Sequence, residues 1–242
     1  MTESAPKYRR VLLKVSGEGL CAPGGQGIDG DELRTLAREI CAAHDTGAQI
    51  AVVVGGGNII RGAQLSRDEH IPQATADYMG MLGTVINALA LKEALEKLDR
   101  PARVMTALDL SSVAEPVIRG RAMRHLEKER VVIFAAGTGN PFFTTDSAAA
   151  LRAIEIGADV LLKATKVDGV YDKDPNQHDD AERFESISYR EAIARDLKIM
   201  DTSAFSLCMD HDIPIVVFNL KAPGHIAEVV AGARHGTLIT RD

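Results

Sequence analysis

The alternation of short apolar runs with helical patterns along this chain predicts an α/β fold, a three-layer αβα sandwich with a largely parallel central sheet. Apolar, β-branched runs without internal charge, such as residues 49–54 and 131–136, are typical of strands buried on both faces. Segments with apolar residues at helical spacing separate these runs. No internal repeat, low-complexity tract or linker interrupts the pattern, so we expect a single domain over residues 1–242.

Composition and charge exclude several classes of protein. The 242 residues are 45% hydrophobic and 26% charged, as in ordinary globular proteins, and no apolar run approaches the roughly 20 residues of a membrane span. A net charge of −6 leaves no global basic surface for nucleic acid. The N-terminus has no hydrophobic signal region, so we expect a cytoplasmic protein without a membrane partner. Cys21, Cys41 and Cys208 lack disulfide or zinc spacing and are expected to be reduced thiols.

The first predicted strand, residues 11–15, carries Lys14 close to its end and is followed by Ser16 and Gly17. A lysine beside glycine-containing backbone can hold an anion by its charge and by free N–H groups, although a solvated lysine at a strand end is an equal alternative. A turn-rich segment follows over residues 22–27. Asp29 or Asp31 can then cap a helix that Gly47 ends.

The second predicted strand, residues 49–54, runs into Gly55-Gly56-Gly57-Asn58, with Arg61 just beyond. Three glycines allow the backbone to approach a charged ligand closely. The Walker-type phosphate loop, Gly-x-x-x-x-Gly-Lys-Ser/Thr, does not occur in the sequence, so a kinase here would need another architecture. Residues 63–73 are expected to form a loop. Asp77 is expected to open a long helix to Leu98 whose apolar residues lie in the core or between subunits.

The strongest signal is the end of the strand at residues 131–136, after a strand at 103–107 and a charged helix at 119–129. We expect Arg121, Arg124 and His125 of that helix to face solvent. The loop from Gly137 to Asp146 combines hydroxyls, an amide, two phenylalanines and a carboxylate where an open α/β sheet binds its ligands. The simpler alternative is a tight turn in which Thr145 or Asp146 only caps the next helix.

A further predicted strand, residues 159–165, again ends in a lysine and a hydroxyl, Lys163 and Thr165. The hairpin at 166–175 carries Tyr171, which could form a shelf for an adenine base or could pack on its own stem. Asp201 follows an apolar pair. A last β-α-β passage is expected over residues 213–218, 224–233 and 237–239.

Taken in order, these segments resemble the bacterial-type UMP kinases of the amino-acid-kinase family. The likeness extends from about residue 8 to residue 240, and its most specific parts are the loop Thr138 to Asp146 and the hairpin that follows Lys163. The resemblance implies an amino-acid-kinase-like fold, with an acceptor-binding part at about 7–150 and an ATP-binding part at about 151–242. It implies transfer of the ATP γ-phosphate to UMP, which gives UDP and ADP in pyrimidine nucleotide biosynthesis.

The resemblance also implies a role for each matching position. The catalytic set would be Lys14, Arg61, Asp146, Lys163 and Asp201, with Asp146 organising the lysines. The ATP site would be formed by Lys14, Val15, Ser16, Gly17, Gly57, Arg61, Thr165, Tyr171 and Asp174. The UMP site would be formed by Gly56, Asp77, Thr138, Gly139, Asn140, Pro141, Phe142, Phe143, Thr144 and Thr145. An allosteric GTP segment would consist of Ala22, Pro23, Gly24, Gly25, Gln26 and Gly27.

Family membership would further imply Mg²⁺ with ATP, a homohexamer, activation by GTP and inhibition by UTP. Three segments depart from the family pattern: Ile60 replaces an aromatic residue, the loop 64–76 does not match closely, and residues 22–27 are divergent. The direct metal ligands are not indicated by the sequence.

Two other functions fit parts of the pattern. A family member could phosphorylate a carboxylate, as amino-acid and acetylglutamate kinases do, but the Phe142-Phe143 pair and the hydroxyl-rich loop favour a nucleotide acceptor. A non-catalytic relative could bind nucleotide for sensing or oxyanion storage. The presence of Lys14, Arg61 and Lys163 argues against that second alternative.

Overall fold

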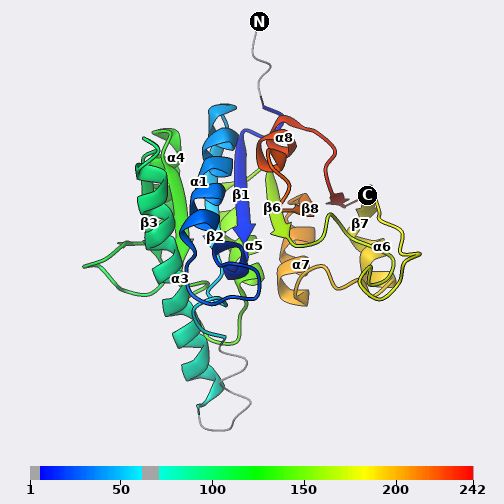
Figure 1. Ribbon diagram of the computed structural model, residues 1–242, viewed down its shortest axis with the longest axis horizontal. Helices are drawn as coiled ribbons and strands as arrows, with labels where there is room; N and C mark the ends of the chain where they lie inside the picture. Colours follow the sequence, from blue (N-terminus) through cyan, green and yellow to red (C-terminus); the bar gives the residue numbers. More distant parts are fainter. Residues whose placement is uncertain (1–5, 62–70, 242) are drawn as a thin grey trace, which may run out of the picture.

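The computed structural model describes residues 6–61 and 71–241, which form a sheet with helices on both faces (Figure 1). The nine described strands lie in the order β4-β3-β5-β2-β1-β6-β8-β9-β7, and every neighbouring pair is parallel except β8 and β9. The predicted three-layer architecture and largely parallel sheet are confirmed. The strands are β1 (Arg10–Val15), β2 (Gln49–Val54), β3 (Ala102–Thr106), β4 (Glu115–Pro116), β5 (Val131–Ala135), β6 (Val160–Thr165), β7 (Ser186–Ser188), β8 (Ile215–Asn219) and β9 (Thr237–Thr240).

The alternating side chains of the central strands divide the core into two layers. Leu13 of β1 belongs to the cluster that packs beneath α1, α3 and α8, whereas its neighbour Leu12 belongs to the cluster beneath α4, α5, α6 and α7. Both leucines are fully buried, which explains why these strands read as continuous apolar runs. The helices are η1 (Gly17–Leu20), α1 (Gly30–Asp45), α3 (Gln73–Glu96), α4 (Arg119–Glu127), α5 (Thr145–Ile156), α6 (Tyr189–Ala194), α7 (Thr202–Asp210) and α8 (His225–Ala231).

The sheet topology brings the polar strand ends together. β1 lies between β2 and β6, so the chain crosses from one half of the sheet to the other at this point. In the β1–β6 ladder, Lys14 is directly opposite Lys163. Because the carboxyl ends of parallel strands share one edge of a sheet, the polar segments that follow β1, β2, β5 and β6 meet there.

The structure determines three helix starts, one of which the sequence left open between two residues. Of the two proposed caps of α1, Asp29 is the N-cap, and its carboxylate accepts hydrogen bonds from the N–H groups of Asp31 and Glu32. The expectation that α3 opens at Asp77 is wrong, because the helix begins one turn earlier, after Pro72. The simpler alternative in which Thr145 or Asp146 caps α5 does not hold, since the Thr144 hydroxyl accepts hydrogen bonds from the N–H groups of Asp146 and Ser147 at the start of this helix.

The expected position of the α3 start was too late because Asp77 looks like a cap from its residue type alone. Pro72 has a non-helical backbone, and its carbonyl accepts the first helical hydrogen bond, from the N–H of Ala76, at 3.0 Å. Residues 63–70 of the preceding predicted loop lie outside the described residues.

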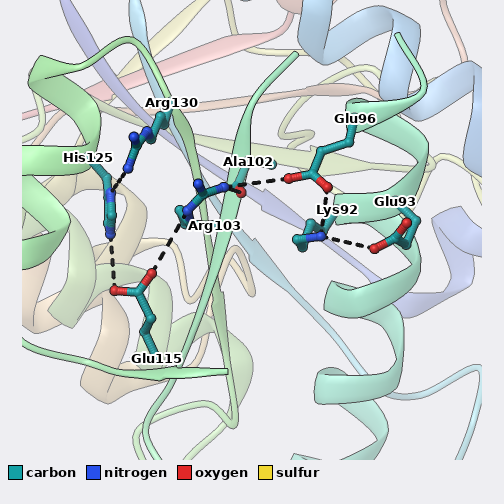
Figure 2. A network of polar contacts seen from close by, with 8 residues as sticks. All are labelled: Lys92, Glu93, Glu96, Ala102, Arg103, Glu115, His125 and Arg130. Atoms are coloured by element: carbon teal, nitrogen blue, oxygen red, sulfur yellow. Dashed lines mark hydrogen bonds and ion pairs between the residues drawn. The ribbon is translucent and has the colours of Figure 1, made fainter. Parts of the chain in front are cut away.

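The sheet edge at β3 and β4 is held by a network of charged side chains that corrects the expectation for α4 (Figure 2). His125 was expected to face solvent, but its side chain is only 12% exposed and its Nε2 lies 3.1 Å from the Glu115 carboxylate. Arg130 contacts the other ring nitrogen at 3.1 Å. Arg103 of β3 lies between Glu96 of α3 and Glu115, so the network joins α3, β3, β4 and α4 (Figure 2).

Candidate functional site

Two lysines and one aspartate meet where β1, β6 and α5 converge. The Asp146 carboxylate lies 2.9 Å from the Lys14 Nζ and 2.6 Å from the Lys163 Nζ, with a different oxygen facing each lysine. The three side chains are only 13–14% exposed. The strand register places the lysines side by side, and the first turn of α5 places the carboxylate between them. This cluster, the Lys14–Asp146–Lys163 triad, therefore carries one net positive charge when all three groups are ionised.

The ammonium group of Lys163 has a second partner besides Asp146. Its Nζ also donates a hydrogen bond to the Ile199 carbonyl at 2.6 Å, so its ammonium group has a fixed direction. Burial lowers the pKa of Lys163 below its ordinary value, and the positive charge of Lys14 acts in the same sense, while Asp146 opposes both. Asp146 therefore helps to keep a desolvated lysine charged.

Asp201, the N-cap of α7, is joined to the triad through α5. Its carboxylate accepts hydrogen bonds from the hydroxyls of Thr144, Ser147 and Ser203, and from the Ala204 N–H at 2.9 Å. Burial alone would raise the pKa of Asp201, but these hydrogen bonds outweigh it and lower the pKa below the ordinary value. The carboxylate thus stays ionised and fixes the start of α5 against α7.

The first cavity has a volume of about 600 Å³ and is lined by Thr144 and Thr145, which directly precede Asp146 in the chain, but not by the triad residues themselves. It lies between the glycine segment after β2, the first turns of α3 and the loop after β5. Eight residues assigned to the site from the sequence line it: Gly56, Gly57, Arg61, Asp77, Thr138, Phe143, Thr144 and Thr145. Its size and its mixture of glycine backbone, hydroxyls and one aromatic ring suit a small polar molecule.

The loop after β5 is shaped by its own polar contacts and by α3. The Asp77 carboxylate accepts a hydrogen bond from the N–H of Phe142 at 2.8 Å, and Phe142 has a φ of 70°. The Asn140 amide turns back to the carbonyl of Thr138. Gly139, Asn140, Pro141 and Phe142 therefore do not line the first cavity, although the sequence placed them in the same site.

The second cavity has a volume of about 640 Å³ and is bordered by the hairpin after β6. Lys163, Thr165, Tyr171 and Asp174 line it, whereas Gly57 and Arg61, which the resemblance also grouped with the ATP site, line the first cavity. The Tyr171 hydroxyl donates to the Asp168 carboxylate of the same hairpin, so the ring makes contacts on its own stem and also faces the cavity. Tyr171 thus packs on its own stem, as one alternative predicted, and also lines the cavity, as the adenine-shelf alternative requires.

The segment after β1 lies beside the cavities without lining either of them. Val15 is buried in the sheet, and the Ser16 hydroxyl caps η1 by accepting from the Glu18 N–H. At Gly17 an added Cβ would come within 2.4 Å of the Asn58 side chain. Glycine is therefore required there because the strand ends of β1 and β2 approach so closely.

The segment Ala22 to Gly27 also lies outside both cavities, but it is bound to the glycine segment. The Gly27 N–H donates to the Asn58 carbonyl at 2.8 Å, and the Asn58 amide donates to the Gly27 carbonyl at 2.7 Å. Asn58 is buried and exchanges side-chain hydrogen bonds with Asn87 of α3. Movement in the segment would thus be transmitted directly to the backbone next to Gly57.

Several lining or supporting residues were not singled out from the sequence. Thr84 lines the first cavity, and its hydroxyl accepts a hydrogen bond from the N–H of Ala136, a residue with a φ of 61°. Glu18 forms ion pairs with Arg61 and Lys166 and thereby holds two cations near the end of β1. An isolated polar residue within the apolar stretch of α3, such as Thr84 or Asn87, is the signal that could have revealed this support.

No dedicated metal cage surrounds the triad among residues 6–61 and 71–241. Both Asp146 oxygens face lysines, and both Asp201 oxygens accept hydrogen bonds. The donor set therefore fits a metal ion that is held mainly by phosphate oxygens and water, as Mg²⁺ commonly is, better than one held by several side chains.

Comparisons with known proteins agree with this geometry. The sequence profile of the amino acid kinase family matches residues 9–219. The chain is 57% identical over 232 residues to a uridylate kinase of Xanthomonas campestris pv. campestris, covering 96% of each chain. It is equally similar, at 57% identity and 96% coverage of each, to a uridylate kinase of Xanthomonas oryzae pv. oryzae.

Solved structures give the same picture. The fold matches a UMP kinase of Bacillus anthracis with a TM-score of 0.94 and 39% identity, covering 97% of each chain. A uridylate kinase of Archaeoglobus fulgidus matches with a TM-score of 0.75 and 29% identity, over 95% of this chain and 99% of the other. The similarity in fold therefore extends over nearly the whole chain.

Proposed function

Because the chain belongs to the amino acid kinase family, we propose that it is a UMP kinase, which transfers the ATP γ-phosphate to UMP and gives UDP and ADP. This reaction is a step of pyrimidine nucleotide biosynthesis. The observation that carries the proposal is the Lys14–Asp146–Lys163 triad together with two cavities of about 600 and 640 Å³, the second lined by Lys163 and the first by Thr144 and Thr145, which precede Asp146. A nucleoside monophosphate kinase needs two nucleotide sites and positive charge for the phosphoryl group that moves between them.

The two cavities are assigned to the two substrates. We assign UMP to the first cavity, whose described lining comes from residues 56–145, and ATP to the second, whose lining comes from residues 163–217. This division supports an acceptor-binding part at about 7–150 and an ATP-binding part at about 151–242 within one domain. Asp77 would hold the ribose hydroxyls of UMP, and Tyr171 with Asp174 would receive the adenosine end of ATP.

The triad would act on the phosphoryl group as it moves between the nucleotides. An oxygen of the UMP phosphate attacks the γ-phosphorus, the bond from that phosphorus to the β,γ-bridging oxygen breaks, and ADP leaves with the electron pair. The acceptor oxygen is already largely ionised at neutral pH, so no general base is required. Lys14 and Lys163 stabilise the negative charge of the transferring group, and Arg61 adds a third cation at the mouth of the first cavity.

We propose Mg²⁺ as the metal that accompanies ATP, since a divalent metal is generally required by ATP-dependent kinases. The ion would be held by the phosphates and water. Asp201, whose carboxylate accepts a hydrogen bond from Thr144 near the triad, would order the surrounding solvent. Bound there, the ion would neutralise phosphate charge.

Regulation and assembly belong to the proposal as well. The hydrogen bonds between Gly27 and Asn58 support a role of residues 22–27 in activation by GTP, because they connect this segment to the phosphate-facing glycines. UTP shares its uridine with UMP and would inhibit. A homohexamer is supported by the exposed apolar side chains of α3, Tyr78, Leu82 and Ile86, which are 42–48% exposed and lie four residues apart.

The described residues contain no helix that is long and apolar enough to span a membrane. We place the enzyme in the cytoplasm, where ATP and UMP are available, and we propose neither nucleic acid nor membrane as a partner.

Coupled measurement of ADP release separates the candidate functions. The proposal expects ADP release from ATP that depends on UMP and is absent with acetylglutamate. Release with acetylglutamate instead would identify a carboxylate kinase. Nucleotide binding without release under either condition would identify a non-catalytic relative.

A further inference from the structure

Two histidines and a glutamate gather at α8, away from both nucleotide cavities. The possible ligand atoms of His225, Glu228 and His235 all lie within 4.8 Å of one another, and no other group of three such residues comes together among residues 6–61 and 71–241. None of the three lines the first or the second cavity. The proposed transfer of phosphate does not use them.

The backbone brings these residues together for local reasons. His225 and Glu228 are three residues apart at the start of α8 and therefore share one face of the helix. Gly232 ends α8 with a φ of 106°, and the next N–H, that of Ala233, donates to the Glu228 carbonyl at 2.8 Å. This turn folds the chain back so that His235 lies over the first turn of the helix.

The return segment is also fixed beyond His235. Gly236 has a φ of 83°, and an added Cβ there would come within 2.0 Å of the Val217 carbonyl oxygen. The Gly236 carbonyl accepts a hydrogen bond from Arg183 at 2.9 Å. His235 is thus presented by a constrained backbone and not by a free loop.

One ring nitrogen of the cluster takes part in no hydrogen bond to the part of the chain that the structure describes, although the other groups contact one another. The rings of His225 and His235 stack with centroids 4.2 Å apart and planes 13° apart, and the His235 Nε2 lies 2.5 Å from the Glu228 carboxylate. The Nδ1 of His225 is buried and has no hydrogen-bond partner among the described residues. A buried polar atom without a partner is rare and needs an explanation.

We infer that His225, Glu228 and His235 form a binding site for a divalent transition-metal ion, with Zn²⁺ as the expected occupant. Two imidazoles and one carboxylate with a fourth position left for water form a ligand set that suits Zn²⁺, whereas Mg²⁺ and Ca²⁺ prefer oxygen ligands. Ligand atoms around a tetrahedral zinc ion lie about 3.3 Å apart, given metal–ligand distances of about 2.0–2.1 Å. Modest rotation of the three side chains would bring their ligand atoms, which now lie within 4.8 Å of one another, to this separation.

Access and freedom to rotate are both available. The side chains of His235 and Glu228 are 34% and 54% exposed, and His235 lines a surface hollow of about 390 Å³. A zinc ion bound to both side chains would take the place of the present contact between His235 and Glu228.

Zinc titration of the full-length protein tests the site. The protein is kept reduced and in excess Mg²⁺, which occupies any nucleotide-type metal position, and Zn²⁺ binding is followed by calorimetry. We expect one Zn²⁺ per chain and a visible absorption spectrum of tetrahedral type when Co²⁺ is bound instead. His225→Ala should lower the Zn²⁺ affinity by more than about tenfold, because a first-sphere ligand is lost.

The matched control is His211→Ala, which removes an exposed histidine at the end of α7 and should leave Zn²⁺ affinity unchanged. Glu228→Gln gives a second test, and circular dichroism checks the fold of each variant. The inference is overturned if the wild-type protein binds no Zn²⁺ under these conditions, or if folded His225→Ala and Glu228→Gln both bind it as tightly as the wild type.

Discussion

In the Lys14–Asp146–Lys163 triad, one carboxylate faces two lysines, so one positive charge remains when all three groups are ionised. Asp146 neutralises one of the two positive charges and holds both ammonium groups within 2.6–2.9 Å of its oxygens. An incoming phosphoryl group would meet the remaining charge in a largely desolvated place, where electrostatic stabilisation is stronger than in water.

Replacing Lys14 tests whether its charge serves the moving phosphate. We expect Lys14→Ala to lower turnover by about 100-fold or more while UMP binding stays close to that of the wild type, because a preorganised donor of this kind contributes about 10²–10³ in rate. Steady-state turnover at saturating ATP and calorimetric UMP binding measure the two effects. Lys128→Ala, at an exposed lysine after α4, is the control. Near-normal turnover of Lys14→Ala would exclude the assigned role.

The lowered pKa of Asp201 predicts how the stability of the protein depends on pH. Its pKa is lower in the folded protein than the ordinary 3.8, so folding favours the ionised form. The resulting stabilisation is present above about pH 3.8 and is lost as the pH falls through the lower native pKa. Asp201→Asn should therefore reduce stability at pH 7 and flatten its loss below pH 4.

Urea unfolding of wild type and Asp201→Asn at several pH values between 2.5 and 7 checks this prediction. Asp179→Asn, at an exposed carboxylate that does not line either cavity, serves as the control. Parallel stability curves for wild type and Asp201→Asn across the whole range would show that the Asp201 hydrogen bonds have no such effect.

At the scale of single elements, we propose that the loop after β5 determines which base is accepted. Uracil offers an N3–H donor and an O4 acceptor, whereas cytosine reverses both, so fixed hydroxyls that suit one base leave polar groups unpaired with the other. Each unpaired buried group costs about 1–3 kcal/mol, and mispaired analogues are rejected by up to about 10⁴-fold. We expect a much larger kcat/KM for UMP than for CMP, and a smaller loss for dUMP.

Only part of this loop lines the first cavity, so we propose that the base-reading groups lie in that part. Thr138 and Thr145 line it, whereas the Asn140 amide is turned back to the loop backbone. Thr138→Val and Thr145→Val keep the side-chain shape and should bring the kcat/KM values of UMP and CMP closer together. Equal values for UMP and CMP in the wild type would mean that the loop does not read the base.

The elements that the sequence predicted well are those whose burial is complete. β2 matches its predicted bounds, and β5 and β6 match to within a residue at each end, because strands buried on both faces leave a continuous apolar run. The short elements β4, β7 and α6 were not predicted, since two to six residues carry too little periodicity.

The sequence predicted the charged groups at the strand ends of the site, but it did not predict the residues that hold these strand ends in place. Lys14 and Lys163 stand out because a charge interrupts an apolar strand, and the parallel register then places them opposite each other. Asn58 and Asn87 could not be paired in advance, because their contact depends on how α3 packs against the end of β2. His125 was wrongly expected in solvent for the same reason, as its partner Glu115 comes from a different element (Figure 2).

At the scale of the whole molecule, one face of α3 has no partner within the described chain. The inner face of this helix is buried, while Tyr78, Leu82 and Ile86 form an exposed apolar stripe. Such an exposed apolar stripe is typical of a subunit interface. We expect a symmetric assembly, with six chains, that buries this stripe.

Sedimentation at micromolar concentration checks the assembly. Leu82→Lys combined with Ile86→Lys should reduce the mass, because charges at the centre of an apolar interface are strongly unfavourable. Ile193→Lys changes an exposed apolar residue of α6, 54% exposed, and should leave the mass unchanged. A monomeric mass for the wild type would contradict the expected assembly.

The most direct test of the phosphoryl-transfer account is the single-turnover rate of Asp146→Asn, measured together with its thermal melting. Thr144, not Asp146, caps α5, so the variant should keep the helix and melt cooperatively. Asp159→Asn, which changes a carboxylate bound to backbone N–H groups at the other end of β6, is the matched control. We predict that Asp146→Asn lowers the rate of phosphoryl transfer from ATP to UMP by at least about 100-fold. A folded Asp146→Asn protein that transfers phosphate at the wild-type rate would contradict the account.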